Sequence, residues 1–220
     1  MSSSSSSNSS SSFSSSNSSS SSNPPEWYEY NGANDYEPDN NNLDNPWDKT
    51  EEGSPSKSVN NDVDCDNGKR FTLKTSITGV DMLRYVHTLF TPWYEYVNNA
   101  LGWSAVARLK VIDSGTECQV ISIYDGTYRS MLAFTENKIF VPSYYIVEST
   151  QEYEIDTTDA YHTYTINVIG TALSIKVDDI ERITATLDKA SSSKLFIWGD
   201  LQSTENYGGE VYWDYIKYYV

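Results

Sequence analysis

Hydrophobic and polar side chains alternate strictly along residues 161–182, which predicts two antiparallel strands joined by a tight turn at Gly170-Thr171. One face of this hairpin would carry His162, Tyr164, Ile166, Val168, Leu173, Ile175 and Val177. A lone hairpin is only marginally stable in water, so we expect a second sheet to cover that face.

The same alternation recurs in shorter stretches, and about ten or eleven strands are predicted in total. The others are residues 71–77, 103–112, 119–124, 127–134, 138–141, 144–147, 152–155, 195–198 and 211–220. Asp125-Gly126 is the strongest short-range hairpin signal. Residues 80–101 lack a strand period and contain Pro92, so they are interpreted as a long loop with at most a helical turn. Many closely spaced strands with almost no helical period favour a β-sandwich.

Three regions follow from this pattern. Residues 1–23 are almost entirely serine and predict a flexible linker. Residues 24–61 are acidic and rich in Asn and Pro, with isolated aromatic residues, and are expected to be a mostly disordered linker. The folded domain is expected to occupy residues 62–220.

Several motifs in that domain resemble concanavalin A-like and laminin G-like domains. They are GWSAVARLKV (102–111), ISIYDGTYRSMLAF (121–134), the hairpin with its HTY and Val-Asp elements, LFIWGD (195–200) and GEVYWDYIKYY (209–219). The resemblance implies an all-β, antiparallel jelly-roll sandwich behind a disordered N-terminal tail. The serine tract resembles the linkers of modular secreted bacterial proteins that degrade polysaccharides.

Composition and charge narrow the possible partners. Only 38% of the residues are hydrophobic, tyrosine occurs 18 times, and the net charge is −16. Nucleic acids and anionic membranes attract clustered Lys and Arg, which this chain lacks, so we expect neither as a partner. No apolar run approaches the length that spans a bilayer. Met1 leads directly into serine without a signal peptide, so the chain is interpreted as a piece of something longer.

Tyrosine and tryptophan suit carbohydrate binding, because flat rings cover the apolar faces of sugars while polar groups bond to the hydroxyls. The predicted ligand-binding residues are Trp93, Tyr94 and Tyr96 in the irregular loop and Tyr124 and Tyr128 at the hairpin tip. Each could instead be an ordinary strand or core residue.

Catalytic residues are not predicted. The best match to the carboxylate pattern of glycosidases with this fold is Glu154-Ile155-Asp156-Thr157-Thr158-Asp159, which ends in Asp and is interpreted as a solvated acidic turn. His162 lies in the apolar register and is expected to be a satisfied, buried imidazole. The alternative is a glycoside hydrolase or polysaccharide lyase whose catalytic carboxylates are not identified by these motifs.

A structural calcium ion is a further expectation. The resemblance implies that Asp214, in the WDYI motif, holds Ca²⁺ where the last strand meets the start of the domain. Asp64 and Asp66 supply carboxylates there, and Ca²⁺ takes six to eight oxygen ligands. Cys65 and Cys118 could form a disulfide or remain free thiols.

Together these features predict a secreted, monomeric module of a larger chain that binds a polysaccharide or glycan without cleaving it. A laminin G-like adhesion module that binds protein is the second alternative.

Overall fold

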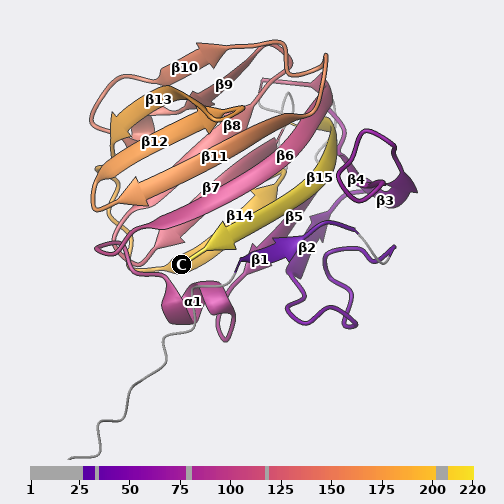
Figure 1. Ribbon diagram of the computed structural model, residues 1–220, viewed down its shortest axis with the longest axis horizontal. Helices are drawn as coiled ribbons and strands as arrows, with labels where there is room; N and C mark the ends of the chain where they lie inside the picture. Colours follow the sequence, from indigo (N-terminus) through magenta and orange to yellow (C-terminus); the bar gives the residue numbers. More distant parts are fainter. Residues whose placement is uncertain (1–26, 33–34, 78–80, 117–118, 202–207) are drawn as a thin grey trace, which may run out of the picture.

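The computed structural model describes residues 27–32, 35–77, 81–116, 119–201 and 208–220. Two antiparallel sheets lie face to face, which confirms the predicted all-β sandwich (Figure 1). We call the sheet nearer the viewer in Figure 1 the front sheet and the other the back sheet. None of the described helices is long and apolar enough to cross a membrane.

Eight strands of the described chain form the front sheet. In spatial order they are β13 (Ile180–Thr186), β12 (Ala172–Val177), β11 (His162–Ile169), β6 (Trp103–Ser114), β15 (Gly209–Tyr219), β4 (Lys69–Lys74) and β3 (Ser56–Asn61), with β1 (Tyr28–Tyr30) paired to β15. The long strands β6 and β15 lie at its centre and give the sheet its length.

Seven strands of the described chain form the back sheet. In spatial order they are β10 (Gln151–Glu154), β9 (Lys138–Val141), β8 (Arg129–Phe134), β7 (Gln119–Asp125), β14 (Lys194–Gly199), β5 (Met82–His87) and β2 (Asp48–Glu52). Two single-turn helices complete the described structure, α1 (Pro92–Tyr96) and the 3-10 turn η1 (Ser143–Tyr145).

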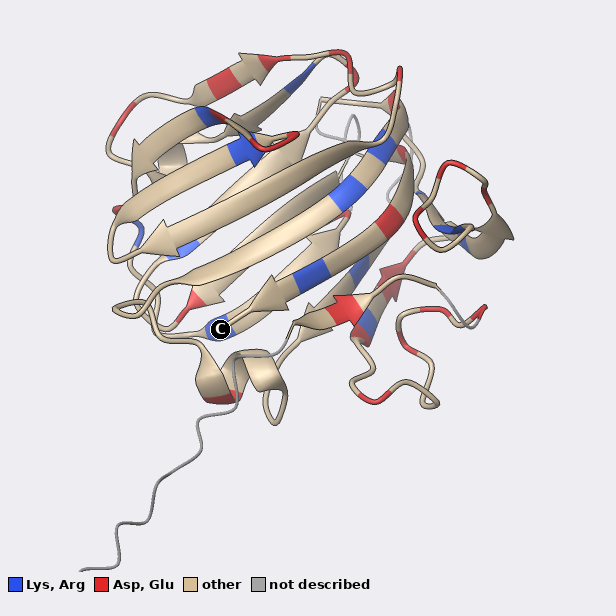
Figure 2. Ribbon diagram, in the orientation of Figure 1, with Lys and Arg blue, Asp and Glu red and all other residues tan. Residues whose placement is uncertain are grey.

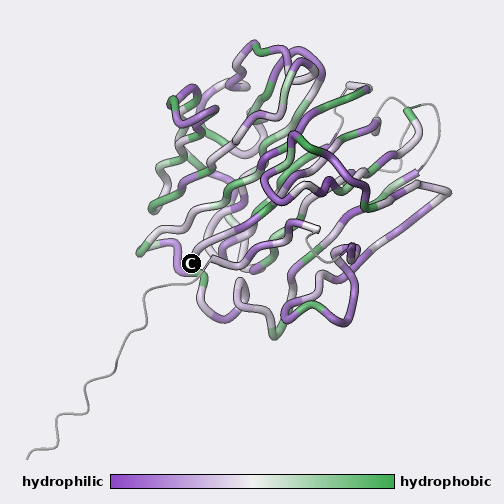
Figure 3. Tube along the Cα trace, turned by 45° about the vertical axis from the view of Figure 1, so that its right-hand side comes forward, coloured by the Kyte–Doolittle hydropathy of each residue, from purple (hydrophilic) through white to green (hydrophobic). Residues whose placement is uncertain are grey.

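The hydrophobic core lies between the two sheets. Trp198 of β14 and Trp213 of β15 meet there from opposite sheets, with ring centroids 4.8 Å apart, and neither is exposed to solvent. Figure 3 shows the alternation of hydrophobic and hydrophilic residues along the strands that produces this packing. Burial of these large aromatic rings contributes to the hydrophobic driving force for folding.

The predicted hairpin of residues 161–182 is confirmed as β11 and β12, which pair from Tyr164↔Val177 to Ile169↔Ala172. Gly170 forms the turn with a φ of 59°, a left-handed conformation that glycine adopts at little cost. His162 is only partly buried, because it lies at the open end of the hairpin among carboxylates.

The N-terminal segment differs from the expectation. Residues 24–61 were predicted to be a mostly disordered linker, yet their described part contributes strands β1, β2 and β3. Tyr30 and Trp47 are each only 4% exposed and belong to the hydrophobic core. Their rings complete the packing between the sheets, so the folded domain begins well before Asp62. Residues 1–26, including the serine tract, lie outside the described residues.

The irregular stretch of residues 80–101 also contains more structure than predicted. It includes β5, which pairs with β14 and β2 in the back sheet, followed by α1. Pro92 opens α1, where its missing N–H costs no hydrogen bond. The strand was missed because apolar residues occupy both of its faces and give no alternation.

Candidate functional site

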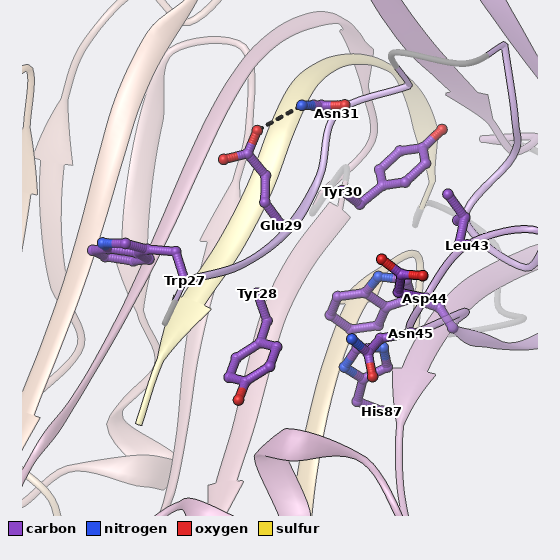
Figure 4. A pocket seen from close by; sticks show the side chains of 10 residues that line it. Trp27, Tyr28, Glu29, Tyr30, Asn31, Leu43, Asp44, Asn45 and His87 are labelled. Carbon is purple, nitrogen blue, oxygen red and sulfur yellow. Dashed lines mark hydrogen bonds between the residues drawn. The ribbon is translucent and has the colours of Figure 1, made fainter. Parts of the chain in front are cut away.

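A pocket of about 420 Å³ opens between β1 and the loop that precedes β2 (Figure 4). One wall consists of residues 27–31, and the opposite wall consists of residues 43–45 and 47, with His87 of β5 beside them. Strand alternation builds the first wall, since Tyr28 and Tyr30 point toward the core while Trp27 and Glu29 point outward. The pocket is therefore a product of the segment that the sequence assigned to a linker.

Trp27 is the exposed aromatic residue at the rim of this pocket. Its side chain is 44% exposed, and its ring centroid lies 5.6 Å from that of Tyr219. The neighbouring ring of Tyr28 packs at 5.3 Å against Tyr218, which holds the start of β1 against β15. An exposed indole on a strand held in this way can stack on an apolar face of a ligand.

The floor of the pocket is formed by Trp47 and His87. His87 is 2% exposed, and its Nδ1 lies 2.8 Å from the Tyr218 hydroxyl. Burial lowers the pKa of His87 to about 4, so the imidazole is neutral near pH 7. The floor is consequently aromatic and uncharged.

Polar groups lie on both walls of the pocket. The Asn31 amide donates to the Glu29 carboxylate at 2.7 Å on one wall, and Asp44 and Asn45 belong to the other wall (Figure 4). Carboxylates and amides accept and donate the hydrogen bonds that sugar hydroxyls make. A lining that contains an exposed indole and such groups is suited to bind a polar ligand that has one apolar face.

Trp93 does not occupy the exposed position that the sequence predicted for it. It is fully buried, and its Nε1–H donates to the backbone carbonyl of Tyr124 at 3.0 Å. The single turn of α1 directs this ring into the core and directs Tyr94 and Tyr96 outward, where they are 39% and 59% exposed. The prediction that Trp93 stacks on a ligand is therefore wrong.

The structure brings the predicted loop and the predicted hairpin tip to the same end of the sandwich. The Trp93–Tyr124 hydrogen bond joins them directly, and the guanidinium of Arg129 lies 4.6 Å from the centroid of the Tyr124 ring. Tyr128 is partly buried against the core. None of these predicted residues lines the pocket of Figure 4.

The hydroxyl of Tyr218 joins that end of the sandwich to the pocket. It accepts the backbone N–H of Trp93 at 3.2 Å, in addition to its contact with His87. The first turn of α1 is thus fixed to the pocket floor through a single buried side chain.

The residues predicted to hold calcium do come together. The backbone N–H of Asp66 donates to both carboxylate oxygens of the buried Asp214, at 3.1 Å each. The Arg108 guanidinium contacts the same carboxylate and also donates to the Asp64 carbonyl at 3.0 Å. Burial raises the pKa of Asp214, although these two donors partly offset the effect.

The Arg108 guanidinium lies against the Asp214 carboxylate, at the position where the resemblance implied a calcium ion. Within the described ranges no group of three or more His, Cys, Asp or Glu side chains is placed to hold a metal ion. Nearby, Cys65 is a buried free thiol whose pKa is raised to about 12 by burial, while Cys118 lies outside the described residues.

The acidic stretch around Asp156 forms a turn, as predicted. Asp156 accepts hydrogen bonds from the Thr158 N–H at 2.9 Å and from the Thr158 hydroxyl at 2.7 Å. Asp159 lies 2.9 Å from His162 Nε2, and Asp178 lies 2.7 Å from His162 Nδ1. The carboxylate of Asp156 thus stabilises the turn, and those of Asp159 and Asp178 pair with the His162 ring.

The pocket residues were missed because they lie in a polar, aperiodic stretch. The signal that could have found them is the pair of aromatic islands, residues 27–30 and Trp47, since large rings seldom occur in disordered linkers.

No family model and no curated protein matches the sequence. Solved structures do match in shape. One is a carbohydrate esterase from Shiga toxin-encoding bacteriophage phi24B, with a TM-score of 0.56 and 13% identity over 79% of this chain and 89% of that one. Another is domain 4 of AbnA, a GH43 extracellular arabinanase from Geobacillus stearothermophilus, in complex with arabinotriose. Its TM-score is 0.54, with 14% sequence identity over 87% of this chain and 90% of that one.

A third match is the Crh5 transglycosylase in complex with NAG, with a TM-score of 0.57 and 13% identity over 89% of this chain and 87% of that one. At such low identity these likenesses establish the jelly-roll sandwich fold and leave the function to be argued from this chain's own site.

Proposed function

We propose that this chain is a non-catalytic carbohydrate-binding module of a secreted polysaccharide-degrading system. The observation that carries the proposal is the pocket whose lining combines the exposed residue Trp27 with the polar residues Asn31, Asp44 and Asn45. A sugar ring needs one flat apolar contact and several hydrogen-bonding partners, and the pocket offers both.

The fold supports this proposal by analogy. The similar structures named above include an esterase, an arabinanase domain bound to arabinotriose and a transglycosylase bound to NAG, all on the same sandwich. The serine-rich stretch that precedes Trp27 would tether the module to a partner domain and raise the local concentration of that domain at its polymer.

The test is retention of the protein on a panel of soluble and insoluble polysaccharides, with reducing-sugar release measured in the same tubes. Trp27→Ala should weaken retention at least about fivefold, because a stacked ring is worth about 1 kcal/mol beyond the area it buries. Tyr96→Ala is the matched control, since Tyr96 is an exposed aromatic outside the pocket.

Each outcome decides between specific alternatives. Loss of retention in Tyr96→Ala with none in Trp27→Ala would move the site to α1. Release of reducing sugar would show that the protein is a hydrolase and not a binding module. Release of unsaturated sugar ends would show that it is a lyase. Binding to no polysaccharide would favour the adhesion module.

A further inference from the structure

Trp27 lines a second pocket besides the one at the edge of β1. This pocket, of about 510 Å³, lies on the outer face of the front sheet. Its other aromatic residue is Tyr215 of β15, beside Lys217, and Thr163 and Thr165 of β11 supply hydroxyl groups. Trp27 therefore belongs to the lining of both pockets.

Lys217 joins the two rings of this surface. Its Nζ lies 5.4 Å from the centroid of the Trp27 ring and 4.6 Å from that of Tyr215, and 3.7 Å from the carboxylate of Glu29. In cation–π contacts of this kind the ammonium group is attracted to the faces of the rings. Lys217 thus links Trp27, immediately before β1, with Tyr215 of β15.

The charges around both pockets exclude an acidic ligand. The linings together hold four carboxylates, Glu29 and Asp44 in the first pocket and Asp178 and Asp179 in the second, against the single ammonium of Lys217. Figure 2 shows further acidic residues in the N-terminal segment next to β1. A polymer of uronate or sulfate groups would be repelled, whereas a neutral chain pays no such electrostatic penalty.

We propose that one neutral polysaccharide chain occupies both pockets and crosses the indole of Trp27 between them, so that the module binds the interior of a chain. This inference rests on the proposed carbohydrate-binding function. From β1 across β15 and β6 to β11 the path covers roughly 14 Å, at about 4.8 Å between neighbouring strands. Only an oligomer of several sugar units can reach both ends of that path.

The experiment uses calorimetric titration of the full chain with neutral oligosaccharides of increasing length, from disaccharide to octasaccharide, cut from the polysaccharide that it retains. Affinity should rise with length and then level off. Tyr215→Ala should leave disaccharide affinity within about twofold and lower octasaccharide affinity about fivefold, the equivalent of one ring contact. Asn45→Ala should weaken binding at every length, and Tyr96→Ala at none.

Affinity that does not change with length, or a Tyr215→Ala variant that binds the octasaccharide as tightly as the parent, would overturn the two-pocket inference and leave the proposed function standing. Tighter retention on polygalacturonate than on neutral polymers would overturn the assigned ligand class. If the parent protein binds no carbohydrate at all, both the proposed function and this inference fail.

Discussion

Trp47 lies flat against His87, with 3.6 Å between the ring centroids and 14° between the ring planes. The contact joins the stretch before β2 to β5, and through the Tyr218 hydroxyl it extends to the last strand. Both rings are almost fully buried. The N-terminal segment is consequently a structural part of the sandwich.

Replacing Trp47 should therefore destabilise the protein strongly. Trp47→Ala removes a buried indole from the core and should lower the free energy of unfolding by about 3–5 kcal/mol, measured by urea denaturation. Trp27→Ala is the control, because its ring is exposed, and should change stability by less than about 0.5 kcal/mol. Deletion of residues 1–60 removes β1, β2 and all of β3 except Asn61, together with Tyr30 and Trp47, so a cooperative, parent-like transition in that truncation would contradict the packing described here.

His87 should make the protein sensitive to acid. Its pKa is about 4 in the folded state, below the ordinary value near 6.5, because burial favours the neutral ring. The stability contributed by the neutral form is complete above about pH 6.5 and is lost as the pH falls toward 4. Denaturation across this range should show the loss in the parent and a flatter profile in His87→Gln. Equal slopes for the two proteins would show that another group is responsible.

His162 should produce the opposite dependence. Burial opposes its charged form, but the carboxylates of Asp178 and Asp159 outweigh this and raise the pKa of His162. Its contribution to stability is complete below about pH 6.5 and is lost as the pH rises through the raised value. His162→Gln should remove that alkaline loss. The effect is small, because both carboxylates are more than half exposed and screened by solvent. NMR titration of the ring protons measures the shift directly, and a pKa at or below 6.5 would contradict it.

Arg108 should take the stabilising role that the sequence assigned to calcium. Arg108→Ala leaves the Asp214 carboxylate buried without its cationic partner, which should cost about 3–5 kcal/mol. Addition of a chelator should leave the melting temperature of the parent unchanged. If chelation lowers it and Ca²⁺ restores it, a calcium site is present and the ion pair with Arg108 is not its replacement.

Substitutions of Trp93 and Tyr96 should affect stability very differently, although both residues belong to the five-residue helix α1. Trp93→Ala should lower the free energy of unfolding by about 3–5 kcal/mol through the cavity that it leaves. Tyr96→Ala should change it by less than about 0.5 kcal/mol, because that ring is largely exposed. Similar losses of stability in the two variants, measured by thermal unfolding, would contradict the orientation of α1.

Strands were predicted most accurately from the sequence where one face of the strand is buried and the other is solvated. The β11–β12 hairpin is such a case, because period-two alternation encodes it directly. The Asp125-Gly126 turn was predicted from its turn residues instead, since β7 and β8 are mostly buried on both faces. β2 was not predictable, since its DKTEE sequence has no apolar residue and the strand lies at the edge of the back sheet. Its position depends on pairing with β5, which is distant in sequence.

The candidate site was less predictable than the fold. Tyr94, Tyr96, Tyr124 and Tyr128 were chosen for their residue type and loop position, and none of them lines a pocket described above. A single helical turn such as α1 has too few residues for its amphipathic pattern to be read, so Trp93 and Tyr96 could not be told apart. The pocket at Trp27 depends on the docking of β1 against β15, a contact between residues nearly 190 positions apart.

The pairing of β1 with β15 also determines how the domain responds to mechanical load. Tyr28 is opposite Tyr218, so the start of the described chain and its C-terminus lie side by side. Tension applied between these two ends would peel β1 away one hydrogen-bonded pair at a time, beginning at Trp27, instead of shearing the whole ladder at once. The indole that borders both pockets is therefore the first contact to give way, and a pulling force would release a bound ligand before it unfolds the sandwich.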